Sequence, residues 1–283
     1  KTKKISKYDF RDRVVHHALC NVIGSLFENS FIYDSYANRI GKGTLKAIQR
    51  LESFSRKVTF NYTKRAYALK ADIYHYFDQV DQTVLLSILG KKIKCPKTIW
   101  LIHKILANYS TAELRGMPLG NLTSQFFANI YLNELDYFFK HQLRAKYYLR
   151  YVDDFVIFDR SKRRLETYKT AVGIFLRKNL ALQLHPYKSR IIPLQRGVEF
   201  LGMKILPRHK LIKKKNIRKF YCKYRLLCEA YNENAVAYDE IYDFMEGWAA
   251  YAKKANTYKL LKKILASFEE EFLHEISTKE VNK

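Results

Sequence analysis

Three aspartates lie at the ends of apolar segments of this chain. Asp72 follows the segment 66–71, and Asp153 and Asp154 lie between the apolar segments 147–151 and 155–158. Carboxylates forced together at the edge of a hydrophobic sheet repel one another and resist losing water, and a divalent cation relieves both costs. Mg²⁺ prefers oxygen ligands. We therefore expect two Mg²⁺ ions here, or Mn²⁺ in their place, bridged by Asp72 and Asp153, with Asp154 as a weaker ligand or an orienting group.

A pair of such ions supports one kind of chemistry, the in-line displacement of a phosphate group. Two ions about 4 Å apart activate an attacking 3′-hydroxyl and stabilise the leaving pyrophosphate. An Asp-Asp pair alone is also typical of a simple tight turn. The third carboxylate, at the end of a separate apolar segment, favours the metal site over that simpler interpretation.

The charge of the chain points to a polyanionic partner. Its 52 Lys and Arg residues stand against 27 Asp and Glu, a net charge of +25 spread over the whole length. Nucleic acid is the first candidate and an anionic membrane the second. No apolar run approaches the roughly 20 residues of a spanning helix, no signal peptide is visible, and the four cysteines form no CxxC pair. We expect a cytoplasmic nucleic-acid-binding protein with no membrane association.

The apolar pattern predicts a mixed α+β fold, an antiparallel sheet packed on helices and followed by a small helical domain. Helices are expected at 11–30, at 79–107 with a break at Cys95-Pro96, and at 122–140, 163–180 and 214–272. Strands are expected at 66–73, 147–151, 155–158, 189–194 and 197–206. Asn121 or Thr123 is expected to cap the helix that begins near 122.

Six segments, in order along the chain, resemble the sequence blocks of reverse transcriptases. Tyr-Val-Asp-Asp at 151–154 is similar to the family's active-site box, and ADIYHYFD is similar to its first catalytic block. The others are RDRVVHHAL (11–19), YANRIGKGTLKAI (36–48), RGMPLGNLTSQFFANIYLNELD (115–136) and RGVEFLGMKI (196–205). The resemblance implies a right-hand polymerase with fingers at 1–65, a palm at 66–206 and a helical thumb at 207–283. It also implies further finger residues before Lys1.

The resemblance also assigns roles to individual residues. Phe77 matches an aromatic residue that excludes ribonucleotides by a steric clash. Ile73 matches the first of the residues whose backbone lies beside the triphosphate. Lys188 matches a general acid that donates a proton to pyrophosphate. The remaining matches are nucleotide-binding residues Lys3, Arg11, Arg13, Leu119, Gly120 and Gln125, and primer-gripping residues Phe200, Leu201 and Gly202. For the lysines, arginines and Gln125 a solvated surface position is the alternative, and for Phe77 a place in the core.

Two differences in the 115–136 segment narrow the resemblance to one subfamily. Leu119 together with Ser124-Gln125 is similar to the reverse transcriptases of diversity-generating retroelements, whereas group II intron enzymes usually carry Gln and Ser-Pro at these places. The implied activity is RNA-directed DNA synthesis that is mutagenic at template adenines, as part of retrohoming. The implied partners are template RNA, the RNA–DNA hybrid, dNTPs and a small basic accessory protein. A group II intron or retron-like reverse transcriptase is one alternative, and a catalytically idle RNA-binding scaffold is another.

Overall fold

The computed structural model describes residues 9–108, 114–118 and 120–281. Two predicted site residues, Lys3 and Leu119, lie outside the described residues. The chain divides into two compact units, Lys1–Leu194 and Gln195–Lys283. The first unit is a sheet covered by helices and the second is mostly helical, so the α+β class is confirmed.

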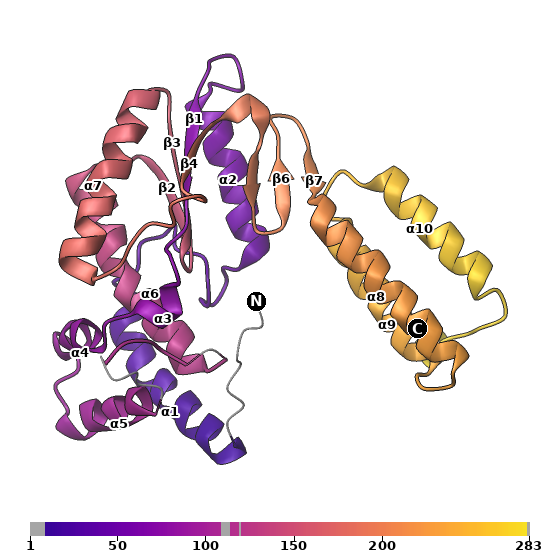
Figure 1. The fold of residues 1–283 in the computed structure, drawn as a ribbon, viewed down its shortest axis with the longest axis horizontal. Helices are drawn as coiled ribbons and strands as arrows, with labels where there is room; N and C mark the ends of the chain where they lie inside the picture. Colours follow the sequence, from indigo (N-terminus) through magenta and orange to yellow (C-terminus); the bar gives the residue numbers. More distant parts are fainter. Residues whose placement is uncertain (1–8, 109–113, 119, 282–283) are drawn as a thin grey trace. The chain divides into compact units, whose positions relative to one another are not determined.

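The sheet of the first unit has four antiparallel strands in the order β2-β3-β1-β4 (Figure 1). Its strands are β1 (Tyr67–Ala71), β2 (Tyr147–Tyr151), β3 (Asp154–Asp159) and β4 (Arg190–Pro193). The pairing of β2 with β3 follows from the sequence, because these two strands form a hairpin. The insertion of β1 between β3 and β4 is a long-range arrangement. It places the end of the 66–71 segment beside the Asp-Asp turn.

Side chains alternate between the two faces of this sheet, and each face packs on different helices. Helix α7 (Lys162–Leu180) lies against β1, β3 and β4 on one face, and helix α2 (Thr44–Val58) lies against β2 and β3 on the other (Figure 1). Phe54 of α2 makes ring contacts with Tyr147 and Phe158. Asp154 lies on β3 four residues before Phe158, so its side chain points to the same face of the sheet as Phe158. Asp72 lies opposite Asp154 when the register of β1 and β3 is continued by one residue, so it also points to the face that α2 covers.

The remaining helices of the first unit are α1 (Phe10–Glu28), α3 (Tyr76–Gln79), α4 (Gln82–Gly90), α5 (Pro96–Ala107) and α6 (Leu122–Tyr137), which continues as a π-helix (Phe138–Gln142). Of these helices, α1 and α4 pack on α6, and α5 packs on α4. Nδ1 of His16 on α1 lies 2.8 Å from Oγ1 of Thr123 in the first turn of α6. Neither expected cap forms: Asn121 occupies the N-cap position without a side-chain capping bond, and Thr123 bonds to His16 instead.

The second unit combines a small sheet with helices. Strands β5 (Val198–Phe200), β6 (Met203–Ile205) and β7 (Lys210–Ile212) pair antiparallel in that order, after a short 3₁₀ turn (Leu194–Arg196). The helices are α8 (Lys214–Asn232), α9 (Tyr238–Ala252), α10 (Tyr258–Glu271) and α11 (Thr278–Val281). Phe220 of α8 stacks on Trp248 of α9 with ring centroids 4.1 Å apart, which joins these helices through an aromatic core.

The structure adds helix α2, strand β7 and the short helices α3 and α11 to the expected order. The chain divides at Leu194 and Gln195, inside the range expected for the palm, so the β5–β6 hairpin belongs to the second unit. The finger, palm and thumb boundaries stay predictions. Among the described residues, no helix combines the length and the apolar character needed to cross a membrane.

Candidate active site

The register of the sheet brings three of the predicted site residues to one end of it. Pairing of Ala71 with Phe155, continued by one residue, sets Asp72 opposite Asp154. Pairing of Lys70 with Arg190, continued in the same way, brings Lys188 to Asp72. Nζ of Lys188 lies 2.9 Å from Oδ2 of Asp72. The register therefore brings Asp72 to the same end of the sheet as Asp154, and the metal-binding and catalytic roles of these residues stay predictions.

The backbone around Asp72 is held by the segment that leads into β4. The amide of His185 donates to the carbonyl of Asp72 at 2.7 Å, and the amide of Tyr74 donates to the carbonyl of Gln183 at 2.8 Å. Nζ of Lys169 on α7 donates to the carbonyl of Ser189 at 2.8 Å. These bonds hold the segment around Lys188, which is distant in the sequence, against the segment that begins at Asp72.

The turn that carries Asp153 is strained. Val152 has φ of 53°, a left-handed conformation that is a genuine outlier for a β-branched residue. Residues held in this way cost about 1–3 kcal/mol and persist only where the surrounding structure enforces them. Burial, together with the charges of Asp154 and Asp72, raises the pKa of Asp153 to about 6. The turn thus presents a carboxylate whose charge is poorly stabilised by the protein alone.

Asp154 has a related environment. Burial raises its pKa, against the opposing effect of Lys70, whose Nζ lies 3.6 Å from Oδ1. That Oδ1 atom is buried and, within the described part of the chain, has no hydrogen-bond partner. Lys70 lies on β1 and Asp72 directly follows this strand, so the two side chains, two residues apart, point to the same face of the sheet.

The three aspartates offer the oxygen ligands that divalent cations prefer. In the structure, however, Asp72 and Asp154 each lie beside a lysine. In residues 9–108, 114–118 and 120–281 no three His, Cys, Asp or Glu side chains lie close enough together to hold a metal ion. Lys188 contacts Asp72 and Lys70 approaches Asp154 instead. The Asp154 oxygen, which is buried and accepts no hydrogen bond from any described residue, and the raised pKa of Asp153 are the electrostatic conditions that a hard cation relieves.

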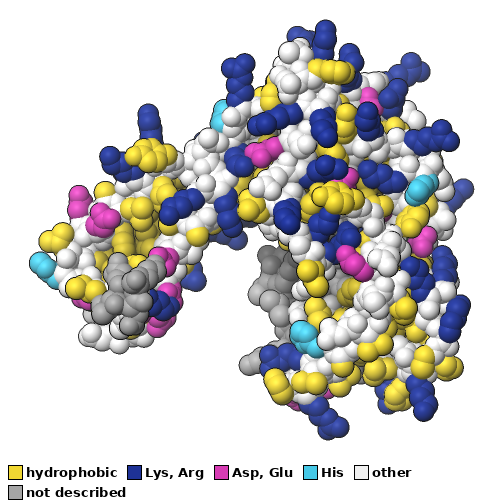
Figure 2. All heavy atoms as spheres, turned by 180° about the vertical axis from the view of Figure 1, so that it is seen from behind, with side chains coloured by type: hydrophobic (Ala, Val, Ile, Leu, Met, Phe, Trp, Pro, Cys, Tyr) yellow, Lys and Arg dark blue, Asp and Glu magenta, His cyan; other side chains and the backbone are white. Residues whose placement is uncertain are grey.

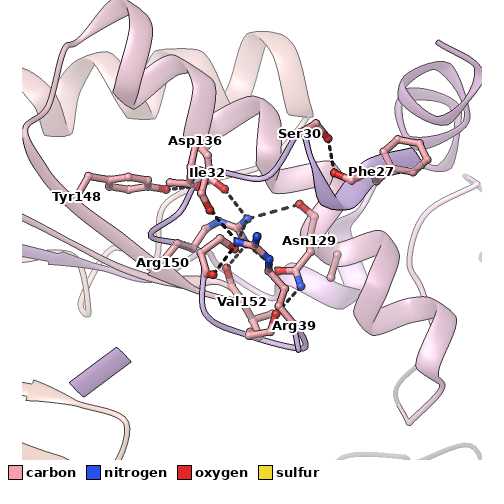
Figure 3. A network of polar contacts seen from close by, with 12 residues as sticks. Phe27, Ser30, Ile32, Arg39, Asn129, Asp136, Tyr148, Arg150 and Val152 are labelled. Carbon is pink, nitrogen blue, oxygen red and sulfur yellow. Dashed lines mark hydrogen bonds and ion pairs between the residues drawn. The ribbon is translucent and has the colours of Figure 1, made fainter. Parts of the chain in front are cut away.

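A buried arginine, Arg150, donates a hydrogen bond to the backbone of the strained turn (Figure 3). Arg150 and Asp136 are both fully buried and form a two-pronged ion pair, with Nε and a terminal nitrogen of Arg150 2.8 Å and 2.6 Å from the carboxylate oxygens. Another nitrogen of Arg150 donates to the carbonyl of Val152 at 3.0 Å. Asn129 and Tyr148 complete the network with bonds of 3.2 Å to Arg150 and 2.6 Å to Asp136. The network therefore ties α6 to the backbone of the turn.

Sequence reasoning missed both Arg150 and Lys70. The signal for Arg150 was present, because a charged residue in the middle of an apolar strand needs a buried partner. Its partner Asp136 lies on α6, and no local pattern connects the two residues. Lys70 carried a weaker signal, since it is one lysine among many in a basic chain.

The predicted nucleotide-pocket residues of the first catalytic block have different exposures. Ile73 is buried at 1% exposure, so only its backbone can face a ligand. Phe77 is half-buried and packs against the core, with its ring 5.2 Å from that of Tyr76. The amide of Met117 donates to the carbonyl of Phe77 at 2.8 Å, which brings the 115–118 segment to this ring.

The other predicted nucleotide-binding residues lie at the adjoining ends of α1 and α6. Gly120 has φ of 108°, a conformation that favours glycine, just before α6 begins. Gln125 is half-exposed in the first turns of α6. Arg11 and Arg13 are exposed in the first turn of α1, which the contact between His16 and Thr123 joins to α6.

The predicted primer-gripping residues form the tight turn of the β5–β6 hairpin in the second unit. Phe200 is fully buried, whereas Leu201 and Gly202 have φ of 46° and 85°. The carbonyl of Gly202 accepts bonds from the Lys213 amide at 3.1 Å and the Tyr251 hydroxyl at 3.2 Å. A side chain at Gly202 would meet that hydroxyl at 2.9 Å. The turn is thus fixed by its own unit and exposes backbone rather than the Phe200 ring.

Comparison with known sequences decides the family. A sequence profile described as Reverse transcriptase (RNA-dependent DNA polymerase) matches residues 1–205. The chain belongs to the reverse transcriptase family. Protein YkfC of Escherichia coli is 24% identical to this reverse transcriptase over 73% of the chain and 62% of its own length. Group II intron-encoded protein LtrA of Lactococcus lactis is 28% identical over 49% of the chain and 23% of its own length. The chain spans less than two thirds of the length of each.

Solved structures agree on the fold. A structure of telomerase from Candida tropicalis in complex with a TWJ fragment of telomeric RNA matches 93% of this reverse transcriptase and 47% of the telomerase chain. The TM-score is 0.56 at 16% sequence identity. At that identity the likeness concerns the fold alone, and it supports the α+β palm and fingers expected from the sequence.

Proposed function

We propose that this chain is an RNA-directed DNA polymerase that makes cDNA from an RNA template. The observation that carries the proposal is the convergence of Asp72, Asp154 and the strained turn bearing Asp153 at one end of the sheet. Membership of the reverse transcriptase family supports it. The net charge of +25 suits binding to template RNA and to an RNA–DNA hybrid, mainly through phosphates.

In the proposed mechanism, Asp72, Asp153 and Asp154 would hold two Mg²⁺ ions, which would supply activation of the primer 3′-hydroxyl and stabilisation of the leaving pyrophosphate. Lys188 would donate a proton to pyrophosphate. Phe77 lies under the sugar of the incoming dNTP, and Gly120 allows the backbone to approach the new base pair. Arg11 and Arg13 contact phosphates, and the Leu201-Gly202 turn contacts the primer.

Primer extension tests the activity directly. We expect the protein to extend a DNA primer on an RNA template with dNTPs and Mg²⁺, and Asp153→Ala to reduce the rate at least about a thousandfold. Asp78→Asn is the matched control, because Asp78 is an exposed acid of the same block that pairs with His75. If the wild type binds RNA without any extension, the idle scaffold is the correct function instead.

Within the family we propose the diversity-generating type, which acts with a small basic accessory protein in adenine-mutagenic retrohoming. The support is the similarity carried by Leu119 and Ser124-Gln125. An apolar residue at 119 removes a polar check on the nascent pair. We expect Leu119→Gln to reduce misincorporation opposite template adenines more than opposite other bases. Identical error spectra would contradict this type and favour a group II intron reverse transcriptase, the class of the relative LtrA.

A further inference from the structure

A pocket of about 510 Å³ lies at the end of the sheet where β2 begins and β3 ends. The turn bearing Asp153 joins the opposite ends of the same two strands. At about 3.3 Å for each residue of a strand, the length of β2 separates the pocket from that turn by about 17 Å. The pocket is lined by the end of α2, the start of β2, the end of β3 and the start of α7. It is therefore distinct from the carboxylate centre.

The lining of this pocket is strongly basic. It includes five exposed cationic side chains, those of Lys57, Arg144, Lys146, Arg160 and Arg164. Asp159, the acidic member of the lining, is already engaged, because its carboxylate accepts from Arg164 at 3.2 Å and from the Ser161 amide at 2.7 Å. Lys and Arg are spread over the visible face of the molecule (Figure 2), but here they converge on one concave site.

Aromatic rings lie beside the cations of the pocket. Phe60 is 60% exposed, and the guanidinium carbon of Arg160 is 5.4 Å from its ring centroid. Nζ of Lys146 is 5.6 Å from the ring centroid of Tyr147. Sites for single-stranded nucleic acid combine exposed rings, on which bases stack, with cations that follow the phosphates. An acidic peptide would use the cations but would have no need for an exposed ring.

The loop that presents Phe60 has an unusual backbone. Phe60, Asn61 and Tyr62 are three successive left-handed residues, with φ of 50°, 56° and 66°. Such a conformation is uncommon for bulky residues and persists only where the fold enforces it. Oγ1 of Thr59 enforces it by donating to the Ser55 carbonyl at 2.5 Å and accepting from the Tyr62 amide at 3.0 Å. The exposed position of Phe60 is thus built into the end of α2.

We propose that this pocket is a second RNA-binding site, which takes a short stretch of single-stranded RNA. A base stacks on Phe60, and the adjoining phosphates contact Lys146 and Arg160. The identity of the ligand as RNA rests on the proposed function, because an enzyme that copies RNA must hold template outside the duplex. Binding at the pocket does not require catalysis, so the two proposals can fail separately.

The test is the binding of a short fluorescent oligouridylate to the full chain in EDTA, over a range of salt concentrations. The pocket variant is Lys146→Gln with Arg160→Gln. The control variant is Arg177→Gln with Lys178→Gln, which removes the same charge from exposed positions in the last turn of α7. We expect about tenfold weaker binding by the pocket variant, and a salt slope smaller by about 1.4, or about 0.7 for each lost phosphate contact. The control variant should change neither.

Stacking is tested separately from charge. We expect Phe60→Ala to weaken binding about tenfold with no change in the salt slope, and Phe60→Tyr to bind as the wild type does. Cross-linking of 4-thiouridine in the probe should label the peptide that contains Phe60. Circular dichroism melts establish that each variant is folded. Asp153→Asn should lose primer extension and keep this binding.

Three results would overturn the proposal. The first is equal affinity of the pocket variant and the control variant. The second is wild-type binding by a folded Phe60→Ala. The third is competition by oligoglutamate that is as strong as competition by RNA, which would make the ligand an acidic peptide. Pocket-dependent RNA binding in a wild type that extends no primer would instead overturn the polymerase function and leave this site standing.

Discussion

Nζ of Lys188 lies 2.9 Å from Oδ2 of Asp72, although the two residues are far apart in the sequence. The contact exists because β4 pairs with β1 in a register that ends at these residues. It joins the predicted general acid to a predicted metal ligand. The structure makes Lys188 a counter-ion to Asp72, and the proposed mechanism adds a second role, as the proton donor to pyrophosphate.

This double role predicts opposite effects of Lys188→Gln on metal binding and on catalysis. Removing a positive charge beside Asp72 should tighten Mn²⁺ binding severalfold, since like charges repel. The single-turnover extension rate should fall by about a hundredfold, because a general acid contributes at least that much. Mn²⁺ titration and rapid-quench extension measure the two effects. Weaker Mn²⁺ binding, or an unchanged rate, would contradict the assigned role, and Lys178→Gln on α7 is the control for lost charge.

The raised pKa of Asp153 predicts a pH-dependent cost to the stability of the metal-free protein. Its folded-state pKa of about 6 lies above the ordinary 3.8, so the native state binds this proton more tightly than the unfolded chain does. The resulting stabilisation is present below about pH 4 and is lost as pH rises through about 6. At about 1.4 kcal/mol for each pKa unit, the loss is about 3 kcal/mol.

Asp153→Asn should therefore be more stable than the wild type at about pH 7.5 in EDTA, by up to about 3 kcal/mol, and should lose that advantage near pH 4. Urea unfolding at the two pH values measures the difference. Added Mg²⁺ should stabilise the wild type but not this variant, because only the wild type retains the ligand. A variant that is no more stable than the wild type at the higher pH would show that Asp153 carries no such cost.

The bond from Arg150 to the Val152 carbonyl predicts that stability and activity can be separated. Arg150→Met leaves Asp136 buried and charged without its cation, which should cost about 3–5 kcal/mol. Arg150→Met combined with Asp136→Leu removes both charges and should recover most of that loss. The double variant should still extend primers about a hundredfold more slowly, because the strained turn loses its donor and the carboxylates shift.

Denaturation midpoints and single-turnover rates, compared with those of Arg150→Lys, test this separation. Arg150→Lys keeps the charge without the two-nitrogen fork and should be intermediate in both measurements. Wild-type extension by the double variant would reduce Arg150 to a purely structural residue.

The position of Phe77 predicts the choice of sugar. Phe77→Val should raise the use of NTPs relative to dNTPs by about tenfold or more, because the smaller side chain no longer clashes with a 2′-hydroxyl. Phe77→Tyr keeps the ring and should preserve the discrimination. Competitive extension with labelled dNTP and NTP pools measures the ratio. An unchanged ratio in a folded Phe77→Val would place this ring in the core alone.

Much of the first unit follows from local sequence pattern. The strands around Asp72 and the Asp-Asp turn are apolar runs bounded by polar residues, and α7 has helical periodicity, so both were predicted within a few residues. The predicted side-chain cap of α6 was wrong, because the Thr123 hydroxyl is hydrogen-bonded to His16 of the distant helix α1. Helix α2 was missed, although its apolar and polar residues alternate at helical spacing.

The sequence by itself determined which residues are expected to carry the chemistry and which strands those residues follow, because apolar periodicity and turn-forming residues act locally. Only the tertiary structure decided the strand order β2-β3-β1-β4, and with it the contact of Lys188 with Asp72, the approach of Lys70 to Asp154 and the support of Val152 by Arg150. The physical reason is that strand pairing and buried ion pairs join residues distant in the chain. Their partners depend on how the whole core packs, and no local pattern records them.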